Sequence, residues 1–414
     1  MISDVGDEIT GRVVGSVESM GGIEDDELCE LIDNIMLEEK YRAYSVKEKL
    51  ELRQDIFNSI KRLDILQSLI EDDSVTEIMI NGYRNIFIER EGKIERYHKT
   101  FASKEKLLDV VQRIAARSNK IVNESTPIID TRLSDGSRVN IVMNPIAIDG
   151  PAVTIRKFYD NPLTMDRLIA LGAITHEAAE YLKELVAARY NIFISGGTGS
   201  GKTTFLNALS DYIPKDERII TIEDSAELKL MGVENIVRLE ARNANMEGKN
   251  AVTIRDMIRA SLRMRPSRII VGEVRGGEAL DMLQAMGTGH DGSLSTGHAN
   301  GTRELMLRLE TMVLMAVDMP VEAIRSQIAA GVDIVVHLER LRDGSRKVVE
   351  IAEVAGVDTQ VERGSIQINS LYRFEKEGLD GEGKVIGCLK RTENELIHRE
   401  KLLSAVGREA VDCI

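Results

Sequence analysis

The residues with the clearest chemical signature form a run of eight, 196–203, which reads Gly-Gly-Thr-Gly-Ser-Gly-Lys-Thr and fits the pattern G-x-x-x-x-G-K-T. Glycines in such a run allow backbone dihedrals that turn N–H groups toward phosphate oxygens, and a following helix adds its positive N-terminal end. The lysine can reach the β and γ phosphates, and the threonine hydroxyl can bind Mg²⁺. We therefore predict a loop that binds ATP and Mg²⁺. Its residues are Gly197, Thr198, Gly199, Ser200, Gly201, Lys202, Thr203 and Thr204.

The surrounding sequence places this loop between a strand and a helix. An apolar run, Asn191 to Ser195, precedes the loop, and a helix-forming run, Thr204 to Leu209, follows it. The alternative is a glycine-rich turn that contains a lysine by chance. The strand and helix context argues against that alternative, because the motif binds phosphate only in this context.

Two carboxylates follow strand-like runs, where a P-loop ATPase needs one acid to position water and another near the metal. Glu223 ends the run Arg218-Ile-Ile-Thr-Ile-Glu, and Glu273 ends Arg268-Ile-Ile-Val-Gly-Glu. Gly272 stands where an aspartate often precedes the glutamate, so the metal would be bound by Thr203, waters, and Glu273 or a nearby carboxylate. Carboxylates at strand ends can also be caps or ion-pair partners, and that alternative stays open.

Two of the six histidines, His290 and His298, lie in one stretch rich in glycine and small hydroxyl residues. Backbone can approach a ligand closely in such a stretch. A metal site made of these two histidines and Asp291 lacks a fourth ligand and a recognisable spacing. We favour a role for His298 as a hydrogen-bonding sensor of the γ-phosphate.

Four arginines crowd the approach to Glu273. We expect Arg263 and Arg268 to be surface partners of the acidic excess. The four are Arg263, Arg265, Arg268 and Arg275.

The order of patterns along the chain predicts three regions, 1–64, 65–158 and 159–414. In the first, after a glycine-rich polar start, Leu28 to Ile35 shows helical spacing, and Ser45 with Glu48 forms a capping box before a second helix. The second mixes strands with a helix at Lys104 to Ser118. In the third, alternating strands and helices imply a parallel sheet covered on both faces, then a short hairpin from about Ser365 and a helix near 395–406. Its expected strands are Asn191 to Ser195, Arg218 to Ile222, Ile236 to Leu239, Arg268 to Gly272 and Val332 to Leu338.

Composition narrows the classes of partner. The net charge is −14, from 68 acidic and 54 basic residues, so a broad positive surface for nucleic acid is not expected. The three cysteines lack C-x-x-C spacing, which argues against a zinc ribbon or a disulfide framework and favours a reducing, cytoplasmic setting. No run of about 18 apolar residues could span a membrane, so we expect any membrane contact to be peripheral.

Taken together, four motifs resemble those of the type II/type IV secretion ATPases. They are the 196–203 loop, Ile222-Glu-Asp, Val271-Gly-Glu-Val-Arg-Gly-Gly-Glu, and the stretch from Gly289-His-Asp-Gly-Ser to Gly297-His-Ala-Asn. From about residue 65 to the Gly383-Lys-Val-Ile-Gly region, the chain is most similar to the CpaF-type ATPases of Tad (tight adherence) pili. Type II relatives carry a four-cysteine module that this sequence lacks. Further matches are Val75-Thr-Glu-Ile-Met-Ile-Asn-Gly, Asp135-Gly-Ser-Arg-Val-Asn, Asp256-Met-Ile-Arg and Leu262-Arg-Met-Arg-Pro.

This resemblance implies an α/β fold in which a RecA-like P-loop ATPase domain follows a small α+β domain and an N-terminal helical region. It implies Glu223 as the general base or water-positioning residue, Glu273 as the Walker B group acting on Mg²⁺, and His298 as the γ-phosphate sensor, with Lys202 on the phosphates. Arg138 and Arg156 would close over the phosphates, with surface ion pairing as the alternative. The sequence departs from the family at Gly297, where an apolar residue is usual, and at Arg242-Asn-Ala-Asn, where Arg-Pro-Pro-Asn is usual.

The leading hypothesis is a homohexameric ATP-hydrolysing motor for pilus assembly or protein secretion. It would work at the cytoplasmic face of the inner membrane, bound there through membrane platform proteins. A type IV secretion (conjugation) ATPase and a RecA-type nucleic-acid motor are alternatives, although the net charge disfavours the second. A nucleotide switch without sustained hydrolysis is a further alternative.

Overall fold

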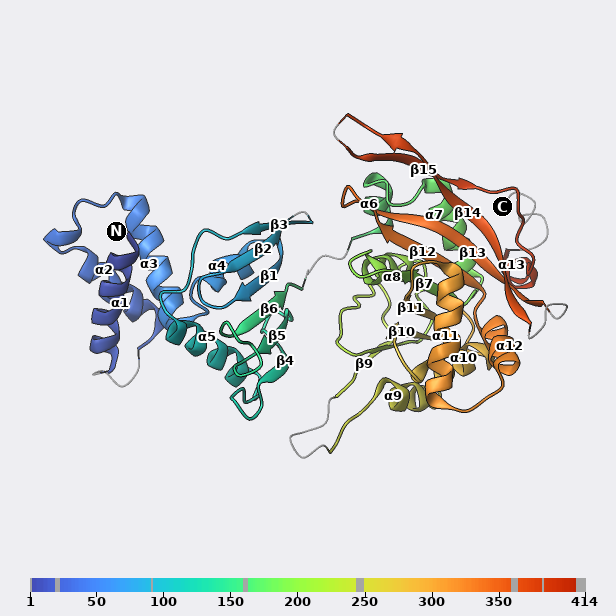
Figure 1. Ribbon diagram of the computed structural model, residues 1–414, viewed down its shortest axis with the longest axis horizontal. Helices are drawn as coiled ribbons and strands as arrows, with labels where there is room; N and C mark the ends of the chain where they lie inside the picture. The colour runs from blue at the N-terminus through green and yellow to red at the C-terminus, as the bar shows by residue number, and fades with distance from the viewer. Residues whose placement is uncertain are drawn as a thin grey trace. The chain divides into compact units, whose positions relative to one another are not determined.

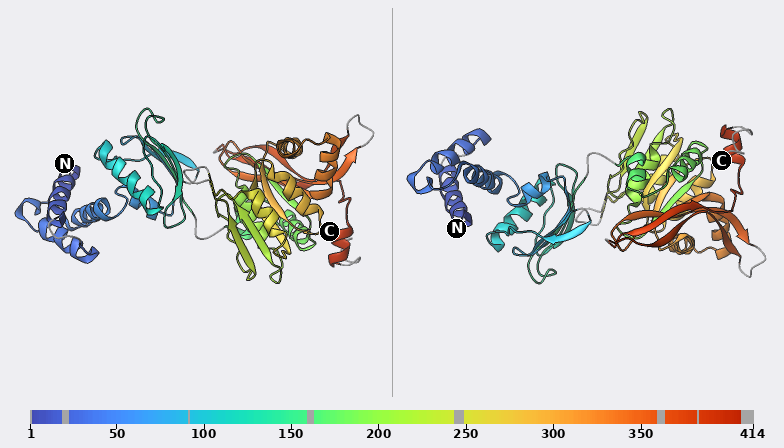
Figure 2. Two further views of the ribbon diagram at one scale, coloured as in Figure 1. Left: turned by 90° about the horizontal axis from the view of Figure 1, so that it is seen from below. Right: turned by 90° about the horizontal axis from the view of Figure 1, so that it is seen from above.

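The structure is a computed structural model that describes residues 2–18, 23–90, 92–158, 163–242, 249–358, 364–381 and 383–406 (Figure 1, Figure 2). The chain divides into two compact units, Met1–Tyr159 and Asp160–Ile414. Within the first unit, the helical region and the α+β region each bury their own cluster of apolar residues. Over the described residues, no helix combines the length and apolar character needed to cross a membrane.

The N-terminal helices pack around a small apolar cluster. Ser45 caps α3, since its hydroxyl accepts from the Glu48 amide and the Glu48 carboxylate accepts from the Ser45 amide, so the predicted capping box is confirmed. The glycine-rich start of this predicted helical region, in which the sequence marks no individual helix, forms α1, because Ile9 and Val13 lie one turn apart and are fully buried. The helices are α1 (Ile2–Glu18), α2 (Asp25–Met36), η1 (Glu39–Tyr41) and α3 (Val46–Lys61).

The second part of the first unit is an antiparallel sheet with the order β3-β2-β1-β6-β5-β4. Alternate residues of its strands, such as Val139 and Ile141, share one buried cluster with α4 and α5. The opposite face carries the polar residues of the same strands, as period-2 alternation requires. The elements are α4 (Leu66–Glu71), β1 (Val75–Asn81), β2 (Ile86–Arg90), β3 (Lys93–Arg96), α5 (Lys104–Arg117), β4 (Ile128–Arg132), β5 (Arg138–Val142) and β6 (Ala152–Arg156).

The second unit is built on a sheet with the order β15-β14-β13-β12-β7-β11-β10-β8-β9. The strands from β12 to β9 are parallel, and β13, β14 and β15 extend the sheet antiparallel. The parallel strands are β7 (Ile192–Gly196), β8 (Ile219–Glu223), β9 (Ile236–Glu240), β10 (Arg268–Val274), β11 (Leu294–His298) and β12 (Ile334–Arg340). The added strands are β13 (Arg346–Asp358), β14 (Ser365–Leu379) and β15 (Val385–Arg391).

Helices cover both faces of this sheet, as the alternation of patterns predicts. Ile192 and Ile194 of β7 share a buried cluster with α6, α7, α8 and α13, whereas Phe193 between them joins α9, α10, α11 and α12. The carboxyl ends of the parallel strands meet at one edge, where ligands bind in such folds. The helices are α6 (Met165–Ala170), α7 (His176–Ala187), α8 (Lys202–Ser210), α9 (Ile254–Ser261), α10 (Glu278–Gly287), α11 (Thr302–Ala316), α12 (Val321–Gly331) and α13 (Glu400–Val406).

Two strands, β11 and β13, are missing from the sequence prediction. β11 reads Leu-Ser-Thr-Gly-His, yet all but its last residue are buried, because its hydroxyls are satisfied by β10. Ser295 donates to the Val271 carbonyl at 3.0 Å, and Thr296 donates to the Gly272 carbonyl at 2.7 Å. The C-terminal hairpin is also longer than predicted, and α13 begins at Glu400 rather than near residue 395.

Arg268 is not a surface residue, so that prediction is wrong. Its side chain is fully buried at the start of β10 and makes two hydrogen bonds to the Glu217 carboxylate, at 2.7 and 2.8 Å. Nη1 also donates to the carbonyls of Val186 at 2.7 Å and Gly292 at 3.3 Å. Arg263 is exposed, as predicted.

We expect Arg268→Ala to lower the free energy of unfolding of the second unit by about 3–5 kcal/mol, because the Glu217 carboxylate loses its buried partner. Arg263→Ala is the matched control and should change that free energy by less than about 0.5 kcal/mol. Urea denaturation followed by circular dichroism measures both. Equal midpoints for the two variants would contradict the structural role of Arg268.

Candidate functional site

The loop of residues 197–201 joins β7 to α8 at the carboxyl edge of the nine-stranded sheet. Gly201, immediately before α8, has φ 92°, a left-handed conformation that favours glycine. A Cβ atom on Gly196 would lie 2.5 Å from the Leu338 carbonyl oxygen and 2.5 Å from Oγ of Ser200, so only glycine fits there. The first amide N–H groups of α8 have no partner within the helix and can bind an anion. These residues therefore fit a phosphate group.

Lys202 begins α8 and is 8% exposed. Its Nζ donates to the carbonyls of Gly196 at 3.0 Å and Gly197 at 2.9 Å, and lies 3.3 Å from Nδ1 of His298. An ammonium group has three donors and no acceptor, so these three acceptors match it. The loop therefore holds its own lysine in place at the position where phosphate is expected.

His298 links the lysine of the loop to Glu273. Nε2 of His298 lies 2.7 Å from Oε1 of Glu273, while Nδ1 faces Lys202. The other carboxylate oxygen of Glu273, Oε2, pairs with Arg275, whose Nε lies at 2.7 Å and whose Nη2 lies at 2.5 Å. The structure thus brings together Lys202, His298 and Glu273, three predicted site residues from three separate elements.

The protonation state of His298 follows from its surroundings. Burial lowers the pKa of His298 below its usual value, and the positive charges of Lys202 and Arg275 lower it further, against the opposing effect of Glu273. A neutral ring has one N–H donor and one lone-pair acceptor. Since Lys202 can only donate, Nδ1 offers its lone pair and the proton belongs on Nε2. Nε2 lies 2.7 Å from Oε1 of Glu273, but this contact does not have the geometry of a hydrogen bond.

Glu223 ends β8 at the same edge of the sheet, but its carboxylate is hydrogen-bonded to backbone amides. Its side chain is buried, and Oε2 accepts from the amides of Glu227 at 2.7 Å and Leu228 at 3.0 Å. Gly272 lies against it, because a Cβ atom at that position would be 2.9 Å from Cγ of Glu223. A side chain at position 272 would therefore displace the Glu223 side chain, a contact that the sequence alone does not reveal.

The predicted metal pair, Thr203 and Glu273, lies on α8 and at the end of β10. Over the described ranges, no cluster of three or more His, Cys, Asp or Glu side chains could hold a metal ion on its own. One hydroxyl and one carboxylate suit Mg²⁺, which takes most of its six ligands from water and phosphate. The donor set therefore fits a metal that arrives with a nucleotide. Thr204 follows on α8 and is half-buried.

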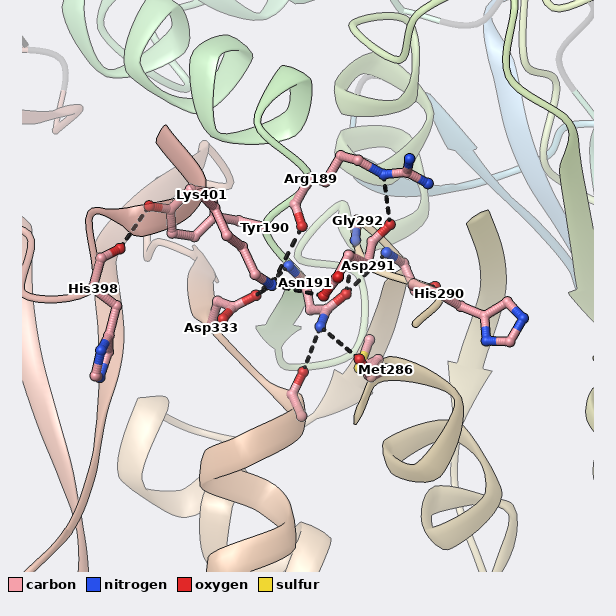
Figure 3. Close-up of polar contacts among 12 residues, drawn as sticks. Arg189, Tyr190, Asn191, Met286, His290, Asp291, Gly292, Asp333, His398 and Lys401 are labelled. Atoms are coloured by element: carbon pink, nitrogen blue, oxygen red, sulfur yellow. Dashed lines mark hydrogen bonds and ion pairs between the residues drawn. The ribbon is translucent and has the colours of Figure 1, made fainter. Parts of the chain in front are cut away.

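The alternative metal site at His290, Asp291 and His298 is wrong, because among the described residues these side chains form no group able to hold a metal ion. His290 and Asp291 precede β11, whereas His298 ends it. Figure 3 shows His290 pointing away from Asp291, whose carboxylate pairs with Lys401 at 2.9 Å. Lys401 also pairs with Asp333 at 2.7 Å, so this cluster ties α13 to the loop before β11.

Arg138 and Arg156 lie in the first unit, directly opposite one another in the register of β5 and β6. Arg132 of β4 stands in register with Arg138, which makes a row of three arginines across neighbouring strands. Like charges in register destabilise a sheet, and Glu77 of β1 is the acid in register with Arg156. Sequence analysis missed Arg132, which no motif marks. The role of Arg138 and Arg156 at the phosphates stays a prediction.

The sequence departs from the family pattern at Gly297 and at Arg242-Asn-Ala-Asn, and the structure describes the first position and part of the second. A Cβ atom on Gly297 would lie 2.8 Å from Cδ1 of Leu305, so a larger residue in β11 would require the Leu305 side chain of α11 to shift. The Arg242-Asn-Ala-Asn segment falls mostly outside the described residues. Only its Arg242 is described, in a backbone bridge with Val252.

Comparison with known proteins gives the family. A family model described as "Type II/IV secretion system protein" matches residues 60–410. A putative conjugal transfer protein of Mycobacterium tuberculosis (strain H37Rv) is 35% identical over 306 residues, covering 72% of this chain and 86% of that protein. The type IV secretion system protein VirB11 of Brucella suis is 33% identical over 320 residues, covering 70% of this chain and 88% of that protein.

The solved structure of the pilus retraction motor PilT with bound ADP has a similar fold. It is 19% identical, with a TM-score of 0.51, covering 75% of this chain and 83% of that chain. Fold and sequence together define a RecA-like P-loop ATPase. The chain belongs to the type II/IV secretion system protein family.

The contact between Gly272 and Glu223 predicts an effect of a single methyl group. We expect Gly272→Ala to lower the free energy of unfolding by about 1–3 kcal/mol, because the added Cβ overpacks the site. Gly287→Ala, whose Cβ would meet no atom within 4 Å, is the matched control. Thermal melting measures both. The double variant Gly272→Ala/Glu223→Ala should recover the stability lost in Gly272→Ala. If it does not, the strain lies elsewhere.

The lowered pKa of His298 predicts a pH dependence of stability. The contribution of the neutral ring is complete above the ordinary histidine pKa of about 6.5 and is lost as pH falls through the lowered folded-state pKa, because the unfolded chain then binds the extra proton. Melting temperatures of wild type and His298→Asn, measured from about pH 7.5 down to about pH 5, should therefore converge. A difference independent of pH would refute the assignment.

Proposed function

We propose that this chain is a homohexameric motor that hydrolyses ATP to power assembly of a Tad or type IV-like pilus, or protein secretion. It works at the cytoplasmic face of the inner membrane, bound to membrane platform proteins, as a CpaF-type ATPase would. The observation that carries the catalytic part is the chain of contacts from Lys202 through His298 to Glu273. Family membership and the fold shared with a pilus retraction motor support the mechanical part.

In this proposal the loop binds the phosphates of ATP, and Mg²⁺, when bound, would supply positive charge at the transferred phosphoryl group. Lys202 exchanges its carbonyl acceptors for phosphate oxygens, which frees Nδ1 of His298. Thr203 and Glu273 would hold the metal, and His298 senses the γ-phosphate. Because His298 contacts both Lys202 and Glu273, loss of the phosphate can alter the position of Glu273 through the imidazole ring.

Glu223 is the proposed general base, on one condition. The amides of Glu227 and Leu228 occupy Oε2, and a carboxylate that accepts such bonds is a weaker base. The segment that carries these amides therefore has to release Glu223 before it can activate water. Binding of the phosphates by Arg138 and Arg156 is part of the same proposal and is supported by the family resemblance alone.

A second candidate is a type IV secretion ATPase of the conjugation class. It is favoured by one observation, the identity above 30% to a protein named for conjugal transfer and to VirB11. Both candidates share the same ATPase chemistry and differ in the machine that is driven. The chain's charge of −14 still argues against direct work on nucleic acid.

The direct test of catalysis is Lys202→Ala. We expect phosphate release from ATP to fall on the order of 10²–10³-fold, because the phosphates lose their charged donor. Lys183→Ala removes an exposed lysine of α7 that pairs with Glu180 and serves as the control. Wild-type turnover in folded Lys202→Ala protein would overturn the assignment, whereas single-turnover release by wild type would indicate a switch.

The same proteins distinguish a motor bound to membrane platform proteins from a nucleic-acid motor. Nucleotide-dependent capture of pilus or secretion platform proteins from membranes by wild type, and not by Lys202→Ala, supports the motor. DNA-stimulated phosphate release would favour a nucleic-acid motor instead.

A further inference from the structure

The turn between β12 and β13 lies against the phosphate-binding loop. Arg346, the first residue of β13, donates from Nε to the carbonyl oxygen of Gly199 at 2.9 Å. Its Cδ would lie 3.4 Å from a Cβ atom on Gly201, and Nη1 of Arg340 would lie 3.6 Å from a Cβ atom on Gly199. Two arginines that flank one turn therefore contact the glycines of the loop. No sequence motif marks either of them.

The bond from Arg346 fixes the orientation of one peptide. In a planar trans peptide the carbonyl of Gly199 and the N–H of Ser200 point in opposite directions. With the carbonyl held by Arg346, the Ser200 N–H turns toward the inside of the loop, where it makes a long contact of 3.4 Å with the Gly197 carbonyl. That carbonyl also accepts from Lys202, so it marks the interior of the loop.

We infer that Arg346 is a positioning residue that holds the peptide between Gly199 and Ser200 with its N–H facing the bound phosphate. The inference rests on the proposed function, since it takes ATP as the ligand. A long N–H contact is readily exchanged for a phosphate oxygen, and a charge-assisted bond to the opposite side of the peptide is harder to break. Arg346 therefore acts on the nucleotide through the backbone.

The turn is itself held rigidly, which makes Arg346 suitable for this role. The Asp343 carboxylate accepts from the Ser345 amide at 2.9 Å and hydroxyl at 2.6 Å, and from the Val385 amide of β15 at 2.8 Å. The Ser345 hydroxyl, above all, holds the pKa of Asp343 at about 2. Next to Arg346, Lys347 donates to the Gly172 carbonyl at 2.6 Å. The turn is thus fixed to β15 and to the segment after α6.

The charge of the turn adds to this effect. A guanidinium stays protonated at any physiological pH, and Arg346 and Arg340 place two such charges at the loop in addition to Lys202. An anion approaching the loop meets a positive field in an otherwise acidic chain. The hydrogen bond and the charge can be separated by substitution, because lysine keeps the charge and loses the planar Nε donor.

The test is the affinity of the full chain for the fluorescent nucleotide mant-ADP, together with ATP turnover. We expect Arg346→Gln to weaken binding and raise the KM for ATP about ten-fold, the loss typical of a hydrogen bond to a charged group, with kcat changed less than about three-fold. Arg346→Lys should recover only part of the affinity. Arg342→Gln removes an exposed arginine of the same turn and should bind as wild type does.

A double variant tests whether Asp343 affects nucleotide binding through Arg346. Asp343→Ala should weaken binding less than Arg346→Gln, and the combined variant should bind like Arg346→Gln alone, because Asp343 acts through Arg346. Equal affinity of wild type and Arg346→Gln, full recovery in Arg346→Lys, or an equal loss in Arg342→Gln would each overturn the inference. If wild type itself neither binds mant-ADP nor turns over ATP, the proposed function fails instead.

Discussion

A lysine ammonium that is almost excluded from water needs acceptors for its three hydrogens, and the carboxyl edge of the nine-stranded sheet supplies them to Lys202. Two are carbonyls of the loop that precedes it, and the third is the ring of His298. This requirement keeps the imidazole neutral and places its proton on Nε2, the ring nitrogen that lies 2.7 Å from the Glu273 carboxylate. Lys202 thereby sets the protonation state of His298 and, through that ring, the contact made by Glu273.

Strand order makes this possible. β7 lies between β11 and β12, and Gly196 is in register with His298 on one side and with Leu338 on the other. The loop after β7 is therefore flanked by a histidine at the end of β11 and by the arginine-bearing turn after β12. One flank contacts the lysine side chain, and the other holds a peptide of the loop. Both contacts follow from parallel pairing and short connections at one edge.

The sequence predicts those parts of the fold and site whose signals are local. The loop of residues 196–203, the capping box at Ser45 and the strand-end positions of Glu223 and Glu273 each depend on neighbouring residues. Polar residues buried by distant partners escape prediction. Arg268 is buried because Glu217 meets it from 51 residues away, and β11 is buried because its hydroxyls bond to β10. Arg346 is likewise identified only by its contact with Gly199, which lies 147 residues away in the sequence.

The central claim, that one neutral imidazole joins Lys202 to Glu273, can be measured by ¹⁵N nuclear magnetic resonance of labelled histidines in the nucleotide-free protein near pH 7. The His298 signals are identified by their loss in a His298→Asn sample. We expect a neutral ring with its proton on Nε2 and an unprotonated Nδ1. A doubly protonated ring, or a proton on Nδ1, would contradict it.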